Sequence, residues 1–230
     1  MDGCDMLVEA KNISKDYVMG HACVAALRDV TLHIKRGAFA VIAGPSGSGK
    51  STLLNLLGCL DQPTSGTICI AGQNVAELED RELSAFRAKR LGFIFQSFNL
   101  IPVLSAFENV EYPLRLNHVE RNEAKERTAA MLEAVGLADH AKHRPSELSG
   151  GQCQRVAIAR ALVTGPDLVL ADEPTANLDS KTGERIVELM HQMQARSGTA
   201  FLLATHDPMV VAHAVEKHTM RDGHLDTQVL

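Results

Sequence analysis

The sequence predicts an α/β fold in which short buried strands alternate with helices around a layered sheet. The apolar runs 39–43, 168–171 and 200–204 have the length of strands. A strand of a parallel sheet is apolar along its whole length because helices cover both of its faces. Such sheets bind ligands at the carboxyl ends of their strands, so the residues that follow these runs are the first candidates for chemistry.

The first third of the chain is rich in strand patterns. Residues 30–34 alternate apolar and polar side chains, as a strand with one exposed face does. After the run 39–43 comes a glycine-rich turn and then a helix over 50–59, whose leucines at 53, 54, 56 and 57 suit a largely buried helix. Residues 67–71 form another predicted strand, which ends at Gly72.

Helical patterns dominate the middle of the chain, with a proline-interrupted segment through Pro113 between them. Gly136 and the Gly165-Pro166 pair end two of these helices. The predicted helices are 81–90, 122–135 and 150–163. We therefore expect one domain over 1–230, with a core over about 1–96 and 164–230 and an inserted helical subdomain over about 97–163.

Strands and helices alternate again toward the C-terminus. The buried runs 168–171 and 199–205 flank a helix over 182–196 that carries apolar residues on one face. A short helix follows Pro208, and Asp222-Gly223 forms a turn between two short terminal strands.

Composition restricts the class of protein. Hydrophobic residues make up 45% of the chain and charged residues 22%, which is ordinary for a globular domain. The net charge of −5 disfavours binding of nucleic acid by bulk charge and leaves a local basic patch open, and no run approaches the roughly 20 apolar residues of a membrane span. The start of the chain lacks a signal-peptide layout, and the cysteines form an odd set without CxxC spacing, typical of reduced thiols in a cytosolic protein. These cysteines are Cys4, Cys23, Cys59, Cys69 and Cys153.

A phosphate-binding loop follows the first buried run. Its sequence is Gly44-Pro45-Ser46-Gly47-Ser48-Gly49-Lys50-Ser51, and it lies between a predicted strand and a leucine-rich helix, the context that this motif requires. The glycines let successive backbone N–H groups point at phosphate oxygens, and the helix adds its positive dipole end. Lys50 can reach the outer phosphates, Ser51 can ligate Mg²⁺, and Thr52 can add a hydrogen bond. A chance glycine-rich turn is the alternative, which these flanks disfavour.

Two carboxylates follow the second buried run. Asp172 is placed to hold Mg²⁺ beside the phosphate loop, and Glu173 to orient or deprotonate an attacking water. An acidic turn after a core strand is the alternative, and it becomes unfavoured only because the phosphate loop is also present.

With these motifs in place, the chain resembles the ATP-binding cassette ATPases from Leu7 to about Leu225. The most specific match is the family's signature pentapeptide, Leu148-Ser149-Gly150-Gly151-Gln152, at the start of a predicted helix. The family's other motifs occur in its order and at compatible spacing: Gly44–Thr52, Gln96, Asp172-Glu173, Asn177-Leu178-Asp179 and His206.

The resemblance implies a fold and roles for individual residues. The fold is a P-loop NTPase core with a mixed sheet, an antiparallel β subdomain and an inserted helical subdomain. Tyr17 stands where the family stacks an aromatic ring on adenine, with an ordinary strand-end tyrosine as the alternative. Gln96 would complete the Mg²⁺ shell, and His206 would contact the γ-phosphate and help to position Glu173.

The resemblance also implies partners. Residues 149–152 would face the γ-phosphate of ATP bound by a second copy of the chain, with Asp179 at the same interface. The pair would enclose two ATP molecules with Mg²⁺ and power a separate membrane subunit from the cytoplasmic face of the inner membrane. The segments 92–102, 108–110 and 170–179 are most similar to the bacterial branch of lipoprotein-release and macrolide-export ATPases.

Other readings remain open at this point. A chromosome or DNA-repair ATPase would need coiled coils or DNA-binding modules, and a non-hydrolysing regulatory module would not need Lys50, Asp172, Glu173 and His206 intact. Asn177 and Cys153 depart from the family pattern, and Cys153 is a candidate reactive thiol. We also expect apolar side chains after Gln96 to form a groove for a partner helix, or alternatively to pack the insertion. These are Phe98, Leu100, Ile101, Leu104 and Phe107.

Overall fold

The computed structural model describes residues 5–20 and 22–228, so the predictions for Cys4 and for the first four residues lie outside it. Its antiparallel sheet has the strand order β2-β1-β4-β5. The strands are β1 (Met6–Met19), β2 (Ala22–Lys35), β4 (Ser65–Ile70) and β5 (Gln73–Asn74). The sequence predicted β4. Of the two long strands it predicted only the end of β2, because irregularities in the β1–β2 register, such as that between Ala10 and Ile13, interrupt the alternation of side chains.

The second sheet is mixed and has the order β10-β9-β3-β8-β7-β6. The strands β9, β3, β8, β7 and β6 are parallel, and β10 pairs antiparallel with β9. They are β3 (Phe39–Ala43), β6 (Leu91–Ile94), β7 (Leu168–Asp172), β8 (Ala200–Thr205), β9 (Glu216–Arg221) and β10 (His224–Gln228). The α/β fold class with a mixed and an antiparallel sheet is thereby confirmed.

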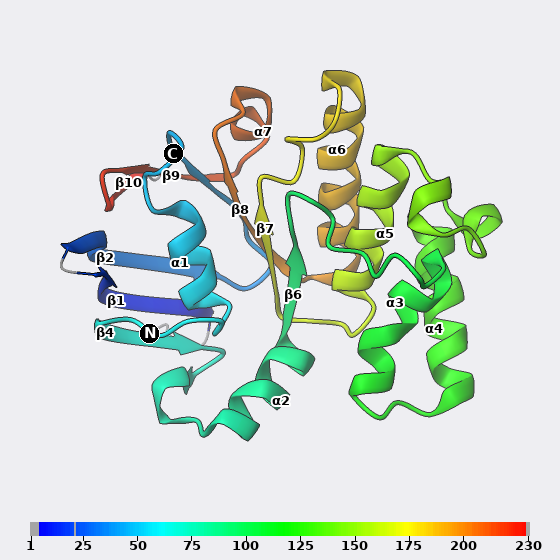
Figure 1. Cartoon of the computed structure of the whole chain (residues 1–230), viewed down its shortest axis with the longest axis horizontal. Helices are drawn as coiled ribbons and strands as arrows, with labels where there is room; N and C mark the ends of the chain where they lie inside the picture. The colour runs from blue at the N-terminus through cyan, green and yellow to red at the C-terminus, as the bar shows by residue number, and fades with distance from the viewer. Residues whose placement is uncertain (1–4, 21, 229–230) are drawn as a thin grey trace.

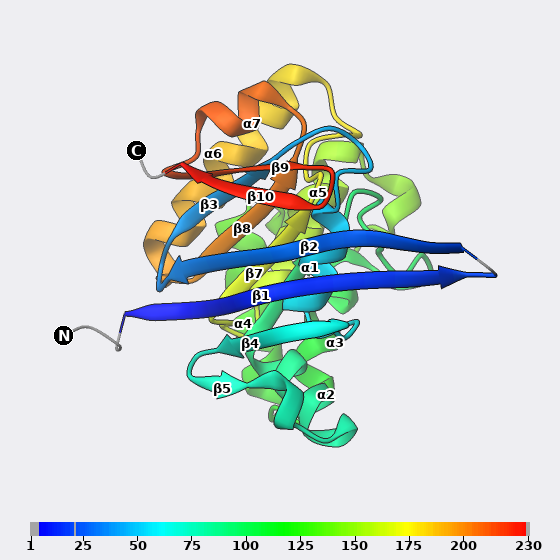
Figure 2. The same cartoon turned by 90° about the vertical axis from the view of Figure 1, so that its left-hand side faces the viewer.

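The mixed sheet is buried on both faces, which explains its apolar strands. Ala40 and Ile42 of β3 face a core shared with helix α1 (Lys50–Leu57) and the antiparallel sheet. Phe39 and Val41 face a second core, which they share with helix α6 (Ser180–Ser197). In Figure 1, α1 lies between the two sheets and α6 on the other side of the mixed sheet. Figure 2 shows the long strands β1 and β2 crossing in front of α1.

A third core lies within the helical part of the chain, on the right of Figure 1. The helices here are α3 (Ala106–Leu116), α4 (Arg121–Ala134) and α5 (Gly150–Leu162). The 3₁₀ turns η2 (Ala138–His140) and η3 (Pro145–Glu147) lie between α4 and α5. Outside this group lie α2 (Asp80–Arg90), α7 (Pro208–Ala212) and the 3₁₀ turn η1 (Val75–Glu77).

Helix α3 was missed at the sequence level because Pro113 lies inside it. A proline in a helix interior costs about 3 kcal/mol, since it removes a backbone hydrogen bond and crowds the preceding turn. Here Ser105 and Glu108 form a capping box at the helix start, and Val110 and Leu114 are almost fully buried in the third core. Packing and capping therefore outweigh the proline.

Among the residues that the structure describes, none of the helices combines the length and the hydrophobicity needed to cross a membrane.

Candidate functional site

The phosphate-binding loop connects β3 to α1 and lies at the carboxyl end of the mixed sheet. Gly49 caps α1 with φ +107°, a conformation that favours glycine, and a Cβ there would stand 2.6 Å from the carbonyl oxygen of Ala26. A Cβ on Gly44 would stand 2.2 Å from the carbonyl oxygen of Met220. Neighbouring backbone thus requires glycine at both positions, which explains the two glycines independently of any ligand.

The loop forms one wall of a hollow of about 530 Å³. The carboxyl ends of β6 and β7 supply the opposite wall, so one site receives residues predicted from three separate motifs. The predicted residues that line it are Ser46, Gly47, Gly49, Lys50, Ser51, Thr52, Gln96, Asp172 and Glu173.

Lys50 is almost buried at the base of this hollow, with 6% of its surface exposed. Its ammonium donates hydrogen bonds to the carbonyl oxygens of Gly44 and Pro45, at 2.7 and 3.0 Å, and lies 3.8 Å from Glu173 Oε1. Ser48 is also buried, and its hydroxyl has no hydrogen-bond partner among the described residues. A buried cation and an unpartnered hydroxyl in one loop suit an anionic ligand such as a phosphate chain.

Glu173 is held in place by the end of β8. His206 Nδ1 lies 2.7 Å from Glu173 Oε1 and donates to it, while Thr205 Oγ1 donates to Oε2 at 3.0 Å. Glu173 itself has φ +47°, an uncommon conformation for a residue other than glycine, and the strand neighbour Ala204 accepts its backbone N–H. The carboxylate is therefore fixed in direction at the mouth of the hollow, as a group that aligns a water molecule must be. The structure thus brings Glu173 and His206 together, and it adds Thr205, which sequence reasoning missed.

Asp172 provides oxygen ligands of the kind that Mg²⁺ prefers. Burial raises the pKa of its carboxyl group and Glu173 adds to the rise, while a hydrogen bond from Ser51 and the charge of Lys50 oppose it. The oxygen Oδ1 is buried without a hydrogen-bond partner among the described residues. An orphaned carboxylate oxygen beside the Ser51 hydroxyl and the Gln96 residue fits a hard, oxygen-seeking cation, so the residues present are suited to Mg²⁺.

Tyr17 lies at the edge of this site without lining it. Its hydroxyl donates to Asp61 Oδ2 at 2.9 Å, and Lys15 Nζ stands 5.0 Å from the centre of its ring. Burial, followed by the bond to Asp61, raises the pKa of the phenol. The cross-strand partner of Tyr17 is Val24, which does line the hollow. The stacking role of Tyr17 on adenine stays a prediction.

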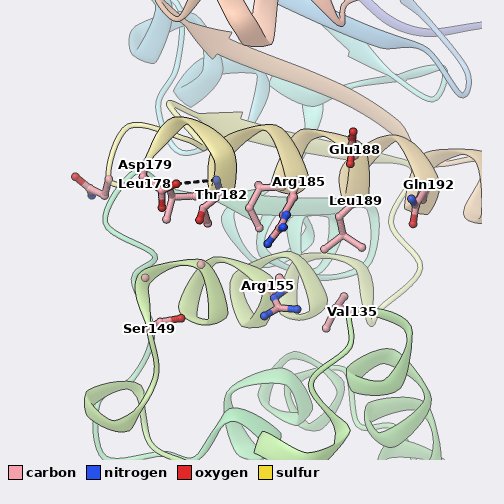
Figure 3. Close-up of a pocket in the computed structure, with 14 residues that line it drawn as sticks. Val135, Ser149, Arg155, Leu178, Asp179, Thr182, Arg185, Glu188, Leu189 and Gln192 are labelled. Carbon is pink, nitrogen blue, oxygen red and sulfur yellow. Dashed lines mark hydrogen bonds between the residues drawn. The ribbon is translucent and has the colours of Figure 1, made fainter.

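The signature turn lies in a different hollow, of about 550 Å³, between α5 and α6. Ser149 caps α5: its hydroxyl accepts from the backbone N–H of Gln152, whose side chain accepts from the N–H of Ser149. Asp179 caps α6 by accepting a hydrogen bond from the backbone N–H of Thr182, and the hydrogen bonds from Thr182 lower the pKa of the Asp179 carboxyl group. Figure 3 shows Ser149 and Asp179 at one end of the hollow, with Arg155 and Arg185 further along it.

Within one chain, the signature turn and the phosphate loop therefore line separate hollows. Ser149, Gly150, Gly151 and Asp179 belong to the second hollow, together with Asn177. Gln152 is engaged in the capping box and is not among the residues that line it. This separation is consistent with the expectation that the signature turn and Asp179 face ATP bound by a second copy of the chain.

The segment after Gln96 is fastened by residues that the sequence did not single out. Arg160 of α5 donates to the carbonyl oxygens of Phe98 and Asn99, at 2.8 and 2.5 Å. The fully buried Asn109 of α3 accepts from the N–H of Ile101 and donates to its carbonyl oxygen. Arg160 satisfies backbone groups more than 60 positions away, which no local pattern indicates.

Gln154 makes a similar tie between the signature helix and the turn after Glu173. Its side chain is fully buried and donates to the carbonyl oxygen of Pro174 at 2.7 Å. The only sequence signal for it is a glutamine on a helix face that is otherwise apolar.

Two expectations need correction. Cys153 is 6% exposed, and burial raises the pKa of its thiol, so the reactive thiolate is disfavoured rather than promoted. Of the two alternatives for the apolar residues after Gln96, packing of the insertion is correct and a groove is wrong for Leu100 and Phe107, which pack against the third core. Asn109 and Arg160 hold this segment against the helices. An apolar groove of about 440 Å³ lies instead between α2, β6 and α3, lined by residues that include Leu60, Phe93, Phe95, Tyr112 and Leu116.

Comparison with known proteins agrees with this geometry. The family model described as ABC transporter matches residues 27–176. The chain is 46% identical to the lipoprotein-releasing system ATP-binding protein LolD of Alcanivorax borkumensis, over 97% of this chain and 98% of LolD. It is 44% identical to the macrolide export ATP-binding/permease protein MacB of Syntrophobacter fumaroxidans, over 96% of this chain but only 31% of MacB.

A solved structure is similar over the same length. It is the dimeric post-hydrolysis state of the ATP-binding cassette MJ0796 of Methanocaldococcus jannaschii bound to ADP and Pi, with a TM-score of 0.87 and 44% identity over 96% of this chain and 98% of that chain. Fold, site and sequence agree over nearly the whole chain. The protein therefore belongs to the ABC transporter family, in which it is an ATP-binding and ATP-hydrolysing subunit.

Proposed function

We propose that the chain works as a dimer that closes around two ATP molecules and drives a separate membrane subunit. The observation that carries this proposal is the division of phosphate-binding groups between two surface hollows. One hollow holds Lys50 and Glu173, and the other holds the Ser149 turn. Each is incomplete alone, and a two-fold pairing of identical chains would complete both at once.

The chain's own residues divide the chemistry of hydrolysis. Lys50 and the N–H groups of the phosphate loop bind the phosphates and offset the charge that develops on them. Glu173 accepts the proton of the attacking water, and His206 keeps the carboxylate aligned through its 2.7 Å hydrogen bond. A proton acceptor positioned in this way contributes about 10²- to 10⁴-fold to a rate.

Ser51, Asp172 and Gln96 are the residues that would hold Mg²⁺. A bound Mg²⁺ would neutralise negative charge on the phosphates. The buried, unpartnered oxygen of Asp172 supports this role, since a divalent cation would offset the unfavourable burial of that carboxylate.

The second copy would contribute residues 149–151 and Asp179. The N–H groups at the start of α5 provide a positive dipole end for the γ-phosphate of the opposite site. Tyr17 would contact the adenine from the edge of the first hollow. Since ATP joins the two halves, hydrolysis and phosphate release would separate them, and this cycle of closing and opening would do the work.

The apolar groove between α2, β6 and α3 is the surface that we assign to the membrane subunit. Leu116 is 57% exposed and Tyr112 is 42% exposed, and both border the groove. An amphipathic helix places its apolar face in such a groove. The similarity to LolD and MacB supports a partner of the lipoprotein-release, efflux or force-transmitting type, with the chain bound at the cytoplasmic face of the membrane.

The nucleotide sandwich is tested by trapping it. In a Glu173→Gln variant, ATP and Mg²⁺ bind while turnover falls at least about 100-fold, so the dimer accumulates and is detected by gel filtration with light scattering. Adding Ser149→Asp keeps the helix cap, because aspartate caps as well as serine, but places a carboxylate against the partner's triphosphate. We expect this double variant to stay monomeric.

The matched control is Ser146→Asp in the same background. Ser146 is an exposed serine three positions before Ser149. The substitution therefore adds the same negative charge outside the turn, and the dimer should persist. A double variant with Ser149→Asp that dimerises as well as this control would refute the assignment of the signature turn to the partner's nucleotide.

A further inference from the structure

Asn177 makes a contact that the predicted roles do not explain. Its side-chain amide donates to the carbonyl oxygen of Gln96 at 2.8 Å. The two residues are 81 positions apart, and they meet because β6 and β7 are neighbours in the mixed sheet. Asn177 is exposed, so this bond adds nothing to the hydrophobic cores.

Hydrogen bonds from two sides restrain the backbone around Gln96. On the helical side, Arg160 holds the carbonyl oxygens of Phe98 and Asn99, two residues that both have positive φ. On the side of β7, Asn177 holds the carbonyl oxygen of Gln96 itself. The direction of a side chain follows the orientation of its backbone, so this second bond restrains where the Gln96 amide points.

Asn177 is well placed to restrain Gln96 relative to the metal-binding oxygens. It follows Asp172 and Glu173 in one short turn, in which Ala176 N–H donates to Glu173 and Leu178 N–H to Thr175. Asp172, Ser51 and Gln96 line the same hollow. The turn that carries the acidic residues thus also sets the position of the third predicted ligand.

We propose that Asn177 is a positioning residue for Mg²⁺ binding, because its amide holds Gln96 in the orientation that reaches the ion. The inference rests on the proposed role of Gln96 as a ligand. The exposure of Asn177 is consistent with a positioning role, since an exposed hydrogen bond adds little to the free energy of folding. Asn177 does not touch the substrate or the metal itself.

The test measures metal affinity apart from turnover. The full chain is loaded with a non-hydrolysable ATP analogue, and bound Mn²⁺ is determined from the electron paramagnetic resonance signal of the free ion. Loss of one hydrogen bond predicts a two- to tenfold weaker Mn²⁺ affinity in Asn177→Ala. The isosteric Asn177→Asp lacks the donor and should lose the bond in the same way. The concentration of Mg²⁺ that half-activates ATP hydrolysis should rise in parallel.

Two further variants separate the possible outcomes. Asn117→Ala is the matched control, since it removes an equally short bond from an asparagine to a backbone carbonyl, that of Ala88, away from the site. It should leave Mn²⁺ affinity unchanged. Gln96→Ala should weaken Mn²⁺ binding at least as much as Asn177→Ala, and adding Asn177→Ala to it should have no further effect.

These variants also separate the two proposals if one fails. If Gln96→Ala binds Mn²⁺ as the wild type does, the proposed role of Gln96 is wrong. If Gln96→Ala weakens binding and both Asn177 variants do not, the role of Gln96 stands and the positioning role of Asn177 is overturned.

Discussion

Replacing Asn109 with alanine should be among the most destabilising single changes in the helical part of the chain. Asn109 is fully buried, and its side chain serves the segment that leads from Gln96 into α3. Its Oδ1 accepts from Ile101 N–H at 2.8 Å, and its Nδ2 donates to the carbonyl oxygens of Ile101, Leu104 and Ser105 at 3.0 to 3.1 Å. An amide nitrogen has two protons, so these contacts amount to about three full hydrogen bonds.

The magnitude follows from that count. Each hydrogen bond contributes about 1 kcal/mol, and the groups left behind are buried, so Asn109→Ala should lower the free energy of unfolding by about 3 kcal/mol. For a domain of this size, 1 kcal/mol corresponds to about 2–4 °C in melting temperature. We therefore expect a drop of about 6–12 °C. The Asn117→Ala control, which loses one bond, should drop by about 2–4 °C.

The assay is thermal unfolding followed by far-ultraviolet circular dichroism, because the chain contains no tryptophan to report on by fluorescence. The comparison is between the two asparagine variants under identical buffer and protein concentration. If Asn109→Ala melts no lower than Asn117→Ala, the counting of buried hydrogen bonds that underlies this reasoning is incorrect.

Two other predictions concern the partner surface and the response to pH. Leu116→Asp should abolish co-purification with the membrane subunit while the isolated chain keeps its ATPase rate. Val103→Asp, at an exposed residue outside the groove, should change neither property. Loss of binding in both variants would contradict the assignment of the groove. Burial raises the pKa of the Cys59 thiol from its ordinary 9.0 to about 11, so the stability that the neutral thiol contributes is complete below about pH 9 and declines as pH rises through 11. The melting temperature of the wild type should therefore fall more steeply over this range than that of Cys59→Ala, and parallel curves would show that the thiol does not titrate there.

The local motifs were accurate where the chemistry depends on neighbouring residues. The loop 44–51 required only its own glycines and its flanking strand and helix to be identified, and the structure places it between β3 and α1. Helices and buried strands with a clear periodicity were predicted to within a few residues. Two kinds of element were missed. One is the long strand β1 with most of β2, whose register is irregular, and the other is α3, whose proline is tolerated because the helix packs in the third core.

The site residues also divide into those that the sequence predicted and those that depend on tertiary contacts. Glu173 and His206 were predicted as a pair from the family resemblance, and the structure brings them to 2.7 Å. Thr205, Gln154 and Arg160 were not predicted, because each acts on a backbone or side-chain atom at least 20 positions away. The order of strands in the sheet determines which residues at such separations come into contact. The composition of the chain and the spacing of its motifs do not reveal that order.

By itself the sequence determined the class of fold, the phosphate loop, the acidic strand end and the signature turn, because each is a short-range pattern with its own backbone chemistry. Only the tertiary structure decided how these parts are distributed. It placed the phosphate loop and the signature turn in separate hollows, fixed the direction of the Glu173 carboxylate, and located the apolar groove between α2, β6 and α3. The physical reason is that strand order and helix packing bring distant residues together, and those contacts depend on the buried surfaces of the whole chain.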